Sequence, residues 1–428
     1  MMKKWKLFAL LVLTLSLLLV ACSGAEEGTD QVQASGDTVT LYVYNWGEYI
    51  SDGSEETLDV NAEFEKWCRE TLGMKVKVNY STFSSNEDLY AKLSSGAASY
   101  DVVIPSDYMI ERMVKDNMLR PLNMENIPNY EHINEAFKGE NVYYEGEKTG
   151  EKAGVIYSVP YFYGMVGVIY NTSVVPETEE NIGSWELMWD PDYDREILQF
   201  NNSRDAFGTA LYKLGYDVNH ATEEQWREAL EELKEQKKLV QGYVMDEIFN
   251  KMKNGSAAIA AYYAGDYLSM YEGYEGEGEL GFFYPKEGTN SYVDAMCIPA
   301  NSKNPTLAEH YINFMCSREI GIANAEYTYY ASPLDTVVED EEYRACMAEV
   351  HEDAMNILYG SAQSVPTQAY LNLSPEGLTR LNDLWEELKI ESSIGDGIYI
   401  GCGVILAALL ALVISLIIKK RRWAKLYD

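Results

Sequence analysis

Residues suited to binding a cation follow directly after a predicted strand near the start of the chain. The alternating side chains of residues 41–44 are typical of a half-buried β-strand. The next positions hold Trp46, Glu48 and Tyr49, two aromatic rings and one carboxylate, beside the flexible Gly47. The face of an aromatic ring attracts a cation, and a carboxylate pairs with one. We interpret this segment as part of a binding site.

Two more groups of polar and aromatic residues lie at predicted strands. The apolar run 101–106 reads as a buried strand that ends at Ser106, and Tyr108 follows it. A later predicted strand presents Tyr292 and Asp294 on one side. Asp294 has apolar neighbours on that strand, and an acid in such a place is costly unless it is paired. Asp294 is therefore the strongest single candidate for contact with a ligand.

The elements that position these residues alternate between strands and helices. Strands are predicted at 39–44, 74–78 and 101–106, and helices from Val60 to about Gly73 and from Glu87 to Leu93. This alternation indicates an α/β domain whose helices pack on a mainly parallel sheet. Ligands of such sheets bind at the carboxyl ends of the strands, which is where the candidates above fall.

A second region with the same character follows. The apolar stretch 155–171 suits a buried strand that crosses between two lobes. Thr222 begins a capping box and hence a helix, and 257–263 is another buried strand. The strand 291–300 is expected to return the chain towards the first lobe. The sequence therefore predicts two α/β lobes.

The two ends of the chain have features of membrane attachment. Residues 1–22 have a basic start, a short apolar centre and a Leu-x-x-Cys ending, so we predict a lipoprotein signal with lipidation at Cys22. Residues 23–37 are small and polar and suit a tether. The uncharged run 398–418 is long enough for a transmembrane helix, and the basic tail 419–428 predicts a cytoplasmic C-terminus. The part between is expected on the outer side of the cell membrane.

Composition excludes some classes of partner. The formal net charge of −34 disfavours binding to nucleic acid and favours cationic ligands. The four cysteines between the predicted anchors show no CxxC spacing, which leaves one or two disulfides or buried free thiols open. They are Cys68, Cys297, Cys316 and Cys346.

Motifs of catalysis, metal binding and cofactor binding are missing from the sequence. It contains no HExxH, GxSxG, Walker or GxGxxG motif, and the four His residues form no ligand-spaced pair. We predict no metal, no cofactor and no enzyme. Paired carboxylates with nearby aromatic residues leave a glycosidase open as a competing interpretation.

Several short motifs together resemble the polyamine-binding lipoproteins of bacterial ABC transporters. The resemblance covers residue 38 to about residue 390. Its motifs are YNWGEY (44–49), SNE (85–87), YDVVIPS (100–106), VPY (159–161), LYKLGY (211–216), PKEG (285–288) and IPAN (298–301).

The resemblance implies a two-lobed clamshell of the periplasmic-binding-protein type (type II), with a cleft between α/β lobes. The first lobe is then expected to comprise 38–158 and 294–328, and the second 159–293 and 329–392.

The resemblance also implies a set of ligand-binding residues. They are Trp46, Glu48, Tyr49, Ser106, Tyr108, Asp205, Tyr263, Asp266, Tyr292, Asp294 and Tyr330. Trp46 and Tyr49 match the aromatic wall of the first lobe in that family, and Glu48 matches the acid between them in the motif. The chain departs from the family pattern at Gly47, at Asn202, where spermidine-type members have an Asp, and at Asp205 and Tyr263, where the family has Glu and Trp. An acid at Asp266, as in putrescine-type members, favours a short diamine or mixed specificity.

The function implied is capture of putrescine, spermidine or both outside the cell and delivery to an ABC permease. Rings and carboxylates fit a polyamine because its methylenes need apolar walls and its ammonium groups need negative charge. Two alternatives stay open besides the glycosidase. One is a ferric-ion carrier that would use Tyr262-Tyr263 or Tyr329-Tyr330 as ligands. The other is a membrane-fixed polyamine sensor.

Overall fold

The computed structural model describes residues 38–96, 98–138, 144–145, 155–360 and 365–390. Cys22 and the predicted signal, the tether 23–37, the span 398–418 and the basic tail lie outside these residues, so these assignments stay predictions. Among the described residues, no helix is both long and apolar enough to cross a membrane.

The first lobe is built on the parallel strands predicted at the start of the chain. β1 (Val39–Trp46) pairs in parallel with β2 (Val76–Phe83) on one side and with β3 (Val102–Val103) on the other. β11 (Thr289–Cys297) continues the sheet beside β3 in the antiparallel direction. The carboxyl ends of the parallel strands β1, β2 and β3 therefore meet at one edge, as the alternation of strands and helices predicted.

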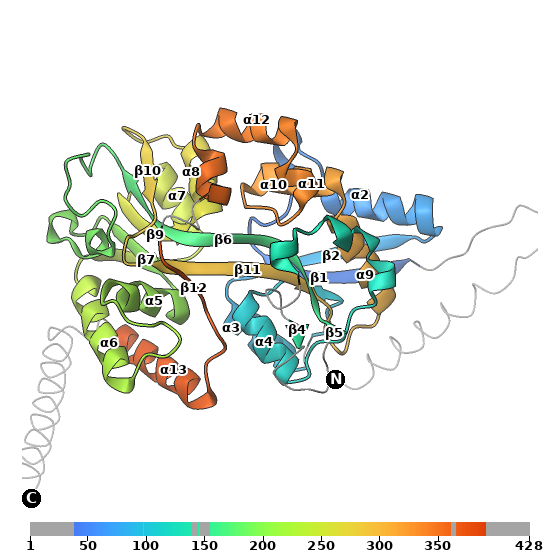
Figure 1. The fold of residues 1–428 in the computed structure, drawn as a ribbon, viewed down its shortest axis with the longest axis horizontal. Helices are drawn as coiled ribbons and strands as arrows, with labels where there is room; N and C mark the ends of the chain where they lie inside the picture. Colours follow the sequence, from blue (N-terminus) through green and yellow to red (C-terminus); the bar gives the residue numbers. More distant parts are fainter. Residues whose placement is uncertain (1–37, 97, 139–143, 146–154, 361–364, 391–428) are drawn as a thin grey trace, which may run out of the picture. The chain divides into compact units, whose positions relative to one another are not determined.

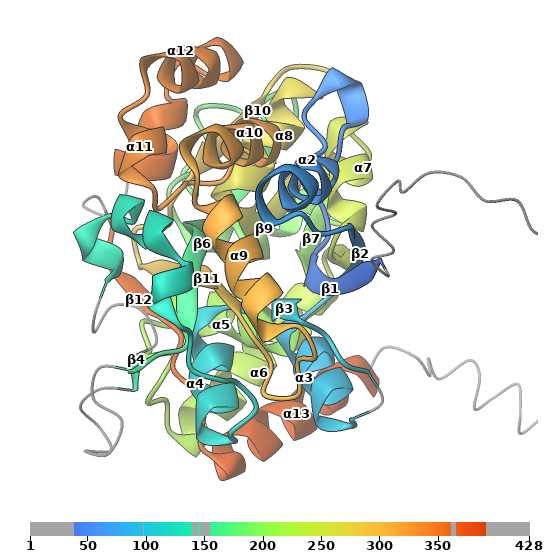
Figure 2. The ribbon, with the colours of Figure 1, turned by 90° about the vertical axis from the view of Figure 1, so that its right-hand side faces the viewer.

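Helices cover both faces of this sheet (Figure 1, Figure 2). Leu41 and Val43 face a core shared with Phe64 of α2, whereas Tyr44 packs in a second core with Leu89 of α3. The helices of this lobe are α2 (Val60–Trp67), α3 (Asn86–Ser94), α4 (Asp107–Lys115), α9 (Pro305–Met315) and α10 (Arg318–Thr328).

Two long strands connect the lobes. β6 (Ser158–Asn171) pairs with β11 along its first half and with β9 (Ile259–Tyr263) along its second half, antiparallel in both cases. Figure 1 shows β6 and β11 running side by side from one lobe to the other. The apolar run predicted to cross between lobes is thus a continuous strand, and the two-lobed α/β architecture is confirmed.

The second lobe repeats the parallel pattern. β7 (Ile197–Phe200) pairs in parallel with β8 (Val240–Val244) and β9, and β10 (Leu280–Phe283) adds an antiparallel strand beside β6. Its helices are α5 (Ser203–Lys213), α6 (Glu223–Lys237), α7 (Glu247–Lys253), α8 (Ala264–Glu272) and α13 (Pro375–Ile390). In Figure 1, α5, α6 and α13 lie on one side of the strands and α7 and α8 on the other.

Short elements complete the described chain. They are α11 (Asp335–Val338), α12 (Glu341–Val350), β12 (Thr367–Ala369) beside β11, and the two-residue strands β4 (Tyr144–Glu145) and β5 (Val155–Ile156). The predicted boundaries between lobes stay predictions.

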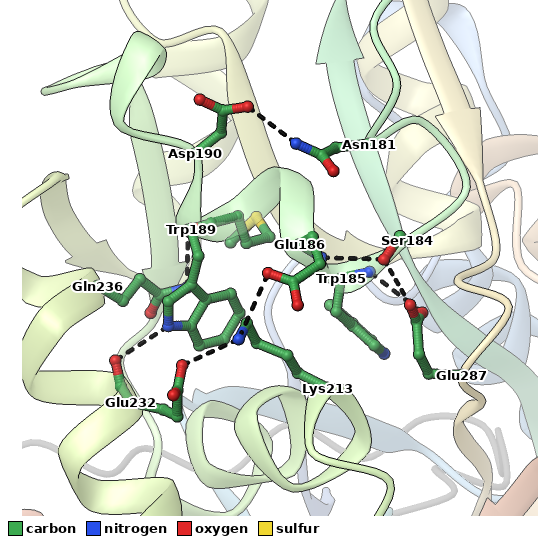
Figure 3. A network of polar contacts seen from close by, with 11 residues as sticks. Asn181, Ser184, Trp185, Glu186, Trp189, Asp190, Lys213, Glu232, Gln236 and Glu287 are labelled. Atoms are coloured by element: carbon green, nitrogen blue, oxygen red, sulfur yellow. Dashed lines mark hydrogen bonds and ion pairs between the residues drawn. The ribbon is translucent and has the colours of Figure 1, made fainter.

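A network of polar contacts fixes a short helix, Trp185–Trp189, in the second lobe (Figure 3). Lys213 Nζ pairs with Glu232 at 2.9 Å and connects α5 with α6 beneath this helix. Ser184, which precedes the helix, donates its hydroxyl to Glu287. Glu287 belongs to the PKEG motif, so that motif has a structural role outside the binding cleft.

Two sequence signals of helix ends are confirmed. Thr222 and Gln225 form the predicted capping box of α6. Gly73 ends the helix that starts at Val60, with a φ of 66°, a conformation that glycine adopts without steric cost. The described cysteines are free, and Cys68, Cys297 and Cys316 are buried, which decides for thiols over disulfides.

Candidate functional site

Ten of the eleven predicted ligand-binding residues line one cavity between the lobes. They are Trp46, Tyr49, Ser106, Tyr108, Asp205, Tyr263, Asp266, Tyr292, Asp294 and Tyr330. The cavity has a volume of about 80 Å³, several times the minimum that one water molecule needs. The lining thus brings together residues that are far apart in the sequence.

Strand ends place these side chains. β1 ends at Trp46, and Ser106 stands at the N-terminus of α4 just after β3. In the second lobe Asp205 lies in the first turn of α5, which follows β7, and Asp266 lies in the first turn of α8, which follows β9. The carboxyl ends of both parallel sets therefore face the same cavity, as expected for ligand sites of α/β sheets.

Asp294 is bound by hydroxyl groups from the first lobe. Tyr49 and Ser106 each donate a hydrogen bond to its carboxylate at 2.6 Å. Asn86 donates in turn to Ser106 Oγ at 3.0 Å. The residue is 5% exposed, and this burial raises the pKa of Asp294 to about 6 although both hydroxyls act to lower it. A buried carboxylate with polar donors but no cation is suited to an ammonium group.

Asp266 forms a second acidic position. Tyr330 donates its hydroxyl to Asp266 Oδ2 at 2.7 Å. Burial raises the pKa of Asp266 to about 8, and the charges of Asp246 and Glu48 add to this rise. The ring of Tyr330 lies so close to Gly265 that a Cβ there would stand 2.7 Å from it. The small residue before Asp266 is thus required for this contact.

A neighbouring contact accompanies that pair. Tyr329 is in the left-handed conformation with a φ of 59°, which is strained for a bulky residue. Its hydroxyl donates to Glu272, at the end of the same α8 helix that carries Asp266. Tyr329 and Tyr330 therefore connect the end of α10 in the first lobe with α8 in the second.

The third acidic position lies at the start of α5. Asp205 accepts hydrogen bonds from Tyr263 Oη at 2.9 Å and from Asn202 Nδ2 at 2.7 Å. Asn202 also caps α5, because its Oδ1 accepts from the Asp205 amide at 2.8 Å. Burial raises the pKa of Asp205. The amide at position 202 therefore supports one carboxylate where an acid would add a second.

Glu48 is the one predicted ligand-binding residue that does not line this cavity. The chain turns sharply at Gly47 and Glu48, and Glu48 has a φ of 48°, so its side chain is exposed and lines a separate depression. That depression shares Asp266 with the cavity. The left-handed backbone turns the Glu48 side chain away from the cavity, and its role as a ligand-binding residue stays a prediction.

Several lining residues were not anticipated from the sequence. They include Glu87, Asp107, Arg204, Asp246 and Tyr370. Glu87 accepts from the Tyr108 hydroxyl at 3.0 Å, and burial raises its pKa. Burial also raises the pKa of Asp107 to about 8. A signal existed for these two, since Glu87 belongs to the SNE motif and Asp107 separates Ser106 from Tyr108.

Arg204 and Tyr370 had no comparable signal. The guanidinium of Arg204 lies 4.4 Å from the ring centre of Tyr370 and donates to Asn219 Oδ1 at 3.0 Å and to the Leu371 carbonyl at 3.2 Å. Tyr370 reaches the cavity from the segment between β12 and α13, far along the chain.

The cavity lining carries a large excess of acidic groups over cationic ones. It holds six carboxyl groups and one cationic side chain, Arg204. The carboxyl groups are Glu87, Asp107, Asp205, Asp246, Asp266 and Asp294, and desolvation raises the pKa of each. Since a nearby cation stabilises the charged form of an acid, a cationic ligand would relieve the cost of burying these groups.

Comparison with known proteins gives three consistent matches. The family model described as bacterial extracellular solute-binding protein matches residues 60–349. A spermidine/putrescine-binding periplasmic protein of Salmonella typhimurium is 31% identical over 339 residues, which cover 78% of this chain and 85% of that protein. A solved structure titled putative spermidine/putrescine ABC transporter from Listeria monocytogenes is 31% identical, with a TM-score of 0.69 over 82% of this chain and 99% of that one.

More distant relatives carry related names. A protein of Escherichia coli named putrescine-binding periplasmic protein PotF is 26% identical over 305 residues, which cover 68% of this chain and 77% of that protein. The substrate-binding protein PotD of Streptococcus pneumoniae, from a spermidine/putrescine ABC transporter, is 29% identical, with a TM-score of 0.62 over 82% of this chain and 99% of that one.

Proposed function

Because the chain belongs to the family of bacterial extracellular solute-binding proteins, which are transport proteins and not enzymes, we propose that its interlobe cavity binds a linear polyamine. The cavity, with the ligand held between the lobes, would then present that polyamine to the permease of an ABC transporter. The names of its relatives support both the ligand class and the partner.

The observation that carries this proposal is the composition of the cavity lining. Carboxyl groups outnumber cationic side chains six to one in this lining, and tyrosine and tryptophan rings lie among them. The rings can pack against methylene groups and attract ammonium groups, and each carboxylate can accept charge-assisted hydrogen bonds. A neutral sugar would leave most of these charges without a partner, and an anion would be repelled.

A diamine such as putrescine fits this lining better than spermidine. Asn202 uses its amide to support Asp205 and to cap α5, so it offers no additional charge for a third amine at that end. Asp266, by contrast, supplies a carboxylate to the cavity where Tyr330 donates a hydrogen bond to it. The lining thus offers one carboxylate at Asp205 and another at Asp266. Two such positions favour a ligand with two ammonium groups.

Isothermal titration calorimetry of the purified chain tests the ligand class. Putrescine and spermidine should bind far more tightly than butylamine or lysine, since butylamine lacks the second ammonium group and lysine adds a carboxylate. Equal affinities for lysine and putrescine would contradict the proposal.

Ferric ion is the alternative that the same titration addresses. A ferric carrier needs tyrosines that ionise readily, but burial and the charge of nearby carboxylates raise the pKa of Tyr262, Tyr263 and Tyr330 well above the ordinary value. Tyr263 and Tyr330 also donate their hydroxyl protons to Asp205 and Asp266. A purple colour on addition of ferric ion would favour the carrier over polyamine binding.

Attachment to the membrane is a separate part of the proposal and rests on the sequence alone. The lipobox at Cys22 and the uncharged run 398–418 would hold the binding domain at the outer face of the cell membrane. Cys22→Ala should leave the protein in the membrane fraction because the span remains. Its release into the medium would contradict the span.

A further inference from the structure

Asp246 is a carboxylate of the cavity whose position depends on a residue of the other lobe. It stands at the start of α7, directly after β8 in the second lobe, and it lines the cavity together with Gly47 of the first lobe. A Cβ atom on Gly47 would lie 2.8 Å from Asp246 Oδ2 and 3.5 Å from its Cγ. The carboxylate therefore occupies space that any side chain at position 47 would take.

The backbone at Gly47 does not itself require glycine. Gly47 is absent from the set of glycines with positive φ, so an alanine could adopt its conformation. The only close neighbour of an added Cβ is the end of the Asp246 side chain, which can rotate away. The glycine is thus explained by the room it leaves for that carboxylate.

Asp246 also acts on Asp266, which belongs to the same lobe. Both residues line the cavity, and the charge of Asp246 raises the pKa of Asp266 and of Tyr262. Within the described part of the chain no ion pair with Asp246 occurs. Two carboxylates that repel each other in this way are stabilised together by one cation between them.

We propose that Asp246 and Asp266 bind the same ammonium group of the ligand, and that Gly47 determines this specificity by admitting the Asp246 carboxylate to the cavity. The inference rests on the proposed function as a polyamine-binding protein and adds one ligand contact and one positioning residue to it. A primary ammonium group has three N–H donors, so it can donate to both carboxylates at once.

Two variants on opposite lobes test this pairing. Asp246→Asn removes the charge, and Gly47→Ala keeps the charge but displaces the carboxylate. Each should weaken putrescine binding by about tenfold or more, because each removes a charge-assisted hydrogen bond. The double variant should bind no more weakly than Asp246→Asn alone, since the second change displaces a group that is already neutral.

Matched controls separate this contact from general effects of charge and of added methyl groups. Glu247→Gln removes an acid that is next to Asp246 in the sequence but does not line the cavity. Gly242→Ala adds a methyl group on β8 whose nearest contact would be at 3.9 Å. Both should bind putrescine as the unaltered chain does. Butylamine affinity should fall less than putrescine affinity in Asp246→Asn, because a monoamine can place its ammonium group at another acid.

Calorimetry with putrescine and butylamine distinguishes failure of this inference from failure of the proposed function. If the unaltered chain binds putrescine and Gly47→Ala and Asp246→Asn bind it equally well, or if their losses add in full, the inference is overturned and the proposed function stands. If the unaltered chain binds no diamine, the proposed function and the inference fail together. Circular dichroism of each variant should match that of the unaltered chain.

Discussion

At the scale of single residues, Asp294 shows how the site uses the cost of burial. Its carboxylate is buried and hydrogen-bonded by Tyr49 and Ser106, yet its pKa remains raised to about 6. The two hydroxyls thus give the carboxylate hydrogen-bond partners, but they do not fully offset the cost of burying its charge. A bound ammonium group would supply the missing compensation.

Asp294→Asn should abolish most of the affinity for putrescine. The change keeps the shape but leaves a buried ammonium without its charged partner, which typically costs about 3–5 kcal/mol, or more than about a hundredfold in affinity. The melting temperature of the ligand-free protein should not fall, because a desolvated charge is removed from its interior. Unchanged putrescine affinity in calorimetry would show that the ligand binds elsewhere.

The raised pKa values also predict how stability depends on pH. The pKa of Asp107 and of Asp266 is about 8 and that of Asp294 about 6 in the folded protein, whereas an unfolded Asp titrates near about 3.9. The folded state therefore keeps protons that the unfolded chain releases. Each group then lowers stability as the pH rises from about 4 to its folded pKa.

Putrescine affinity should consequently rise between pH 5.5 and pH 8.5. The ligand binds the charged carboxylates and lowers their pKa, so protons are released on binding below about pH 8. Calorimetry in buffers of different ionisation enthalpy measures this release. Binding without proton release at pH 6.5 would mean that these carboxyl groups do not contact the ligand.

The sequence predicted site residues whose type is unusual for their surroundings. It did not predict those that only tertiary packing brings to the cavity. Asp294 was found because an acid in an apolar strand needs a partner. Glu87 and Asp107 look like ordinary acids at helix starts, and only tertiary packing buries Asp107 and partly covers Glu87, which raises the pKa of both. The outward direction of the Glu48 side chain follows from its positive φ, which cannot be read from its residue type.

At the scale of elements, the end of α10 is joined to α8 by two adjacent tyrosines. Tyr330 binds Asp266 in the first turn of α8, and Tyr329 binds Glu272 at its end. Because α10 packs with the first lobe and α8 with the second, both contacts would be lost if the lobes moved apart. Tyr329 adopts the left-handed conformation as the C-cap of α10, with its amide donating to the Ala325 carbonyl.

Tyr329→Phe should weaken putrescine binding by about two- to fivefold through faster dissociation, because one exposed interlobe hydrogen bond is lost. Tyr327→Phe is the matched control, since its hydroxyl contacts Ser54 within the first lobe at 2.9 Å. Stopped-flow dissociation rates compare the two variants. If both dissociate at the same rate, the Tyr329 contact does not hold the lobes together.

Element positions were predicted better than element ends. The run 155–171 and the capping box at Thr222 lie where the sequence indicated. The strand predicted at 74–78 begins at Val76 and continues to Phe83, because pairing with β1 extends it through polar residues. The run 101–106 yields only a two-residue strand, β3, although the Pro105 carbonyl still accepts a hydrogen bond from Ala295 of β11 and Ser106 forms an isolated bridge with Asp294.

At the scale of the whole molecule, the cavity exists only because segments distant in sequence meet between two lobes. Its acids come from α3, α4, α5, α8, β11 and the segment before α7. Asn372 of the second lobe donates its backbone amide to Glu111 of α4 at 3.2 Å, and the rings of Tyr108 and Tyr370 meet across the same gap at 6.2 Å. The two-lobed architecture was predictable from the alternation of strands and helices, whereas these contacts between distant segments were not.

If a linear diamine occupies the cavity between the lobes, a crystal structure of the chain with putrescine will show it there. We expect elongated density among the aromatic rings, with one ammonium group within hydrogen-bonding distance of both Asp246 and Asp266 and the other near another carboxylate of the lining. Putrescine bound outside this cavity, or a cavity left without it at saturating concentration, would contradict the account.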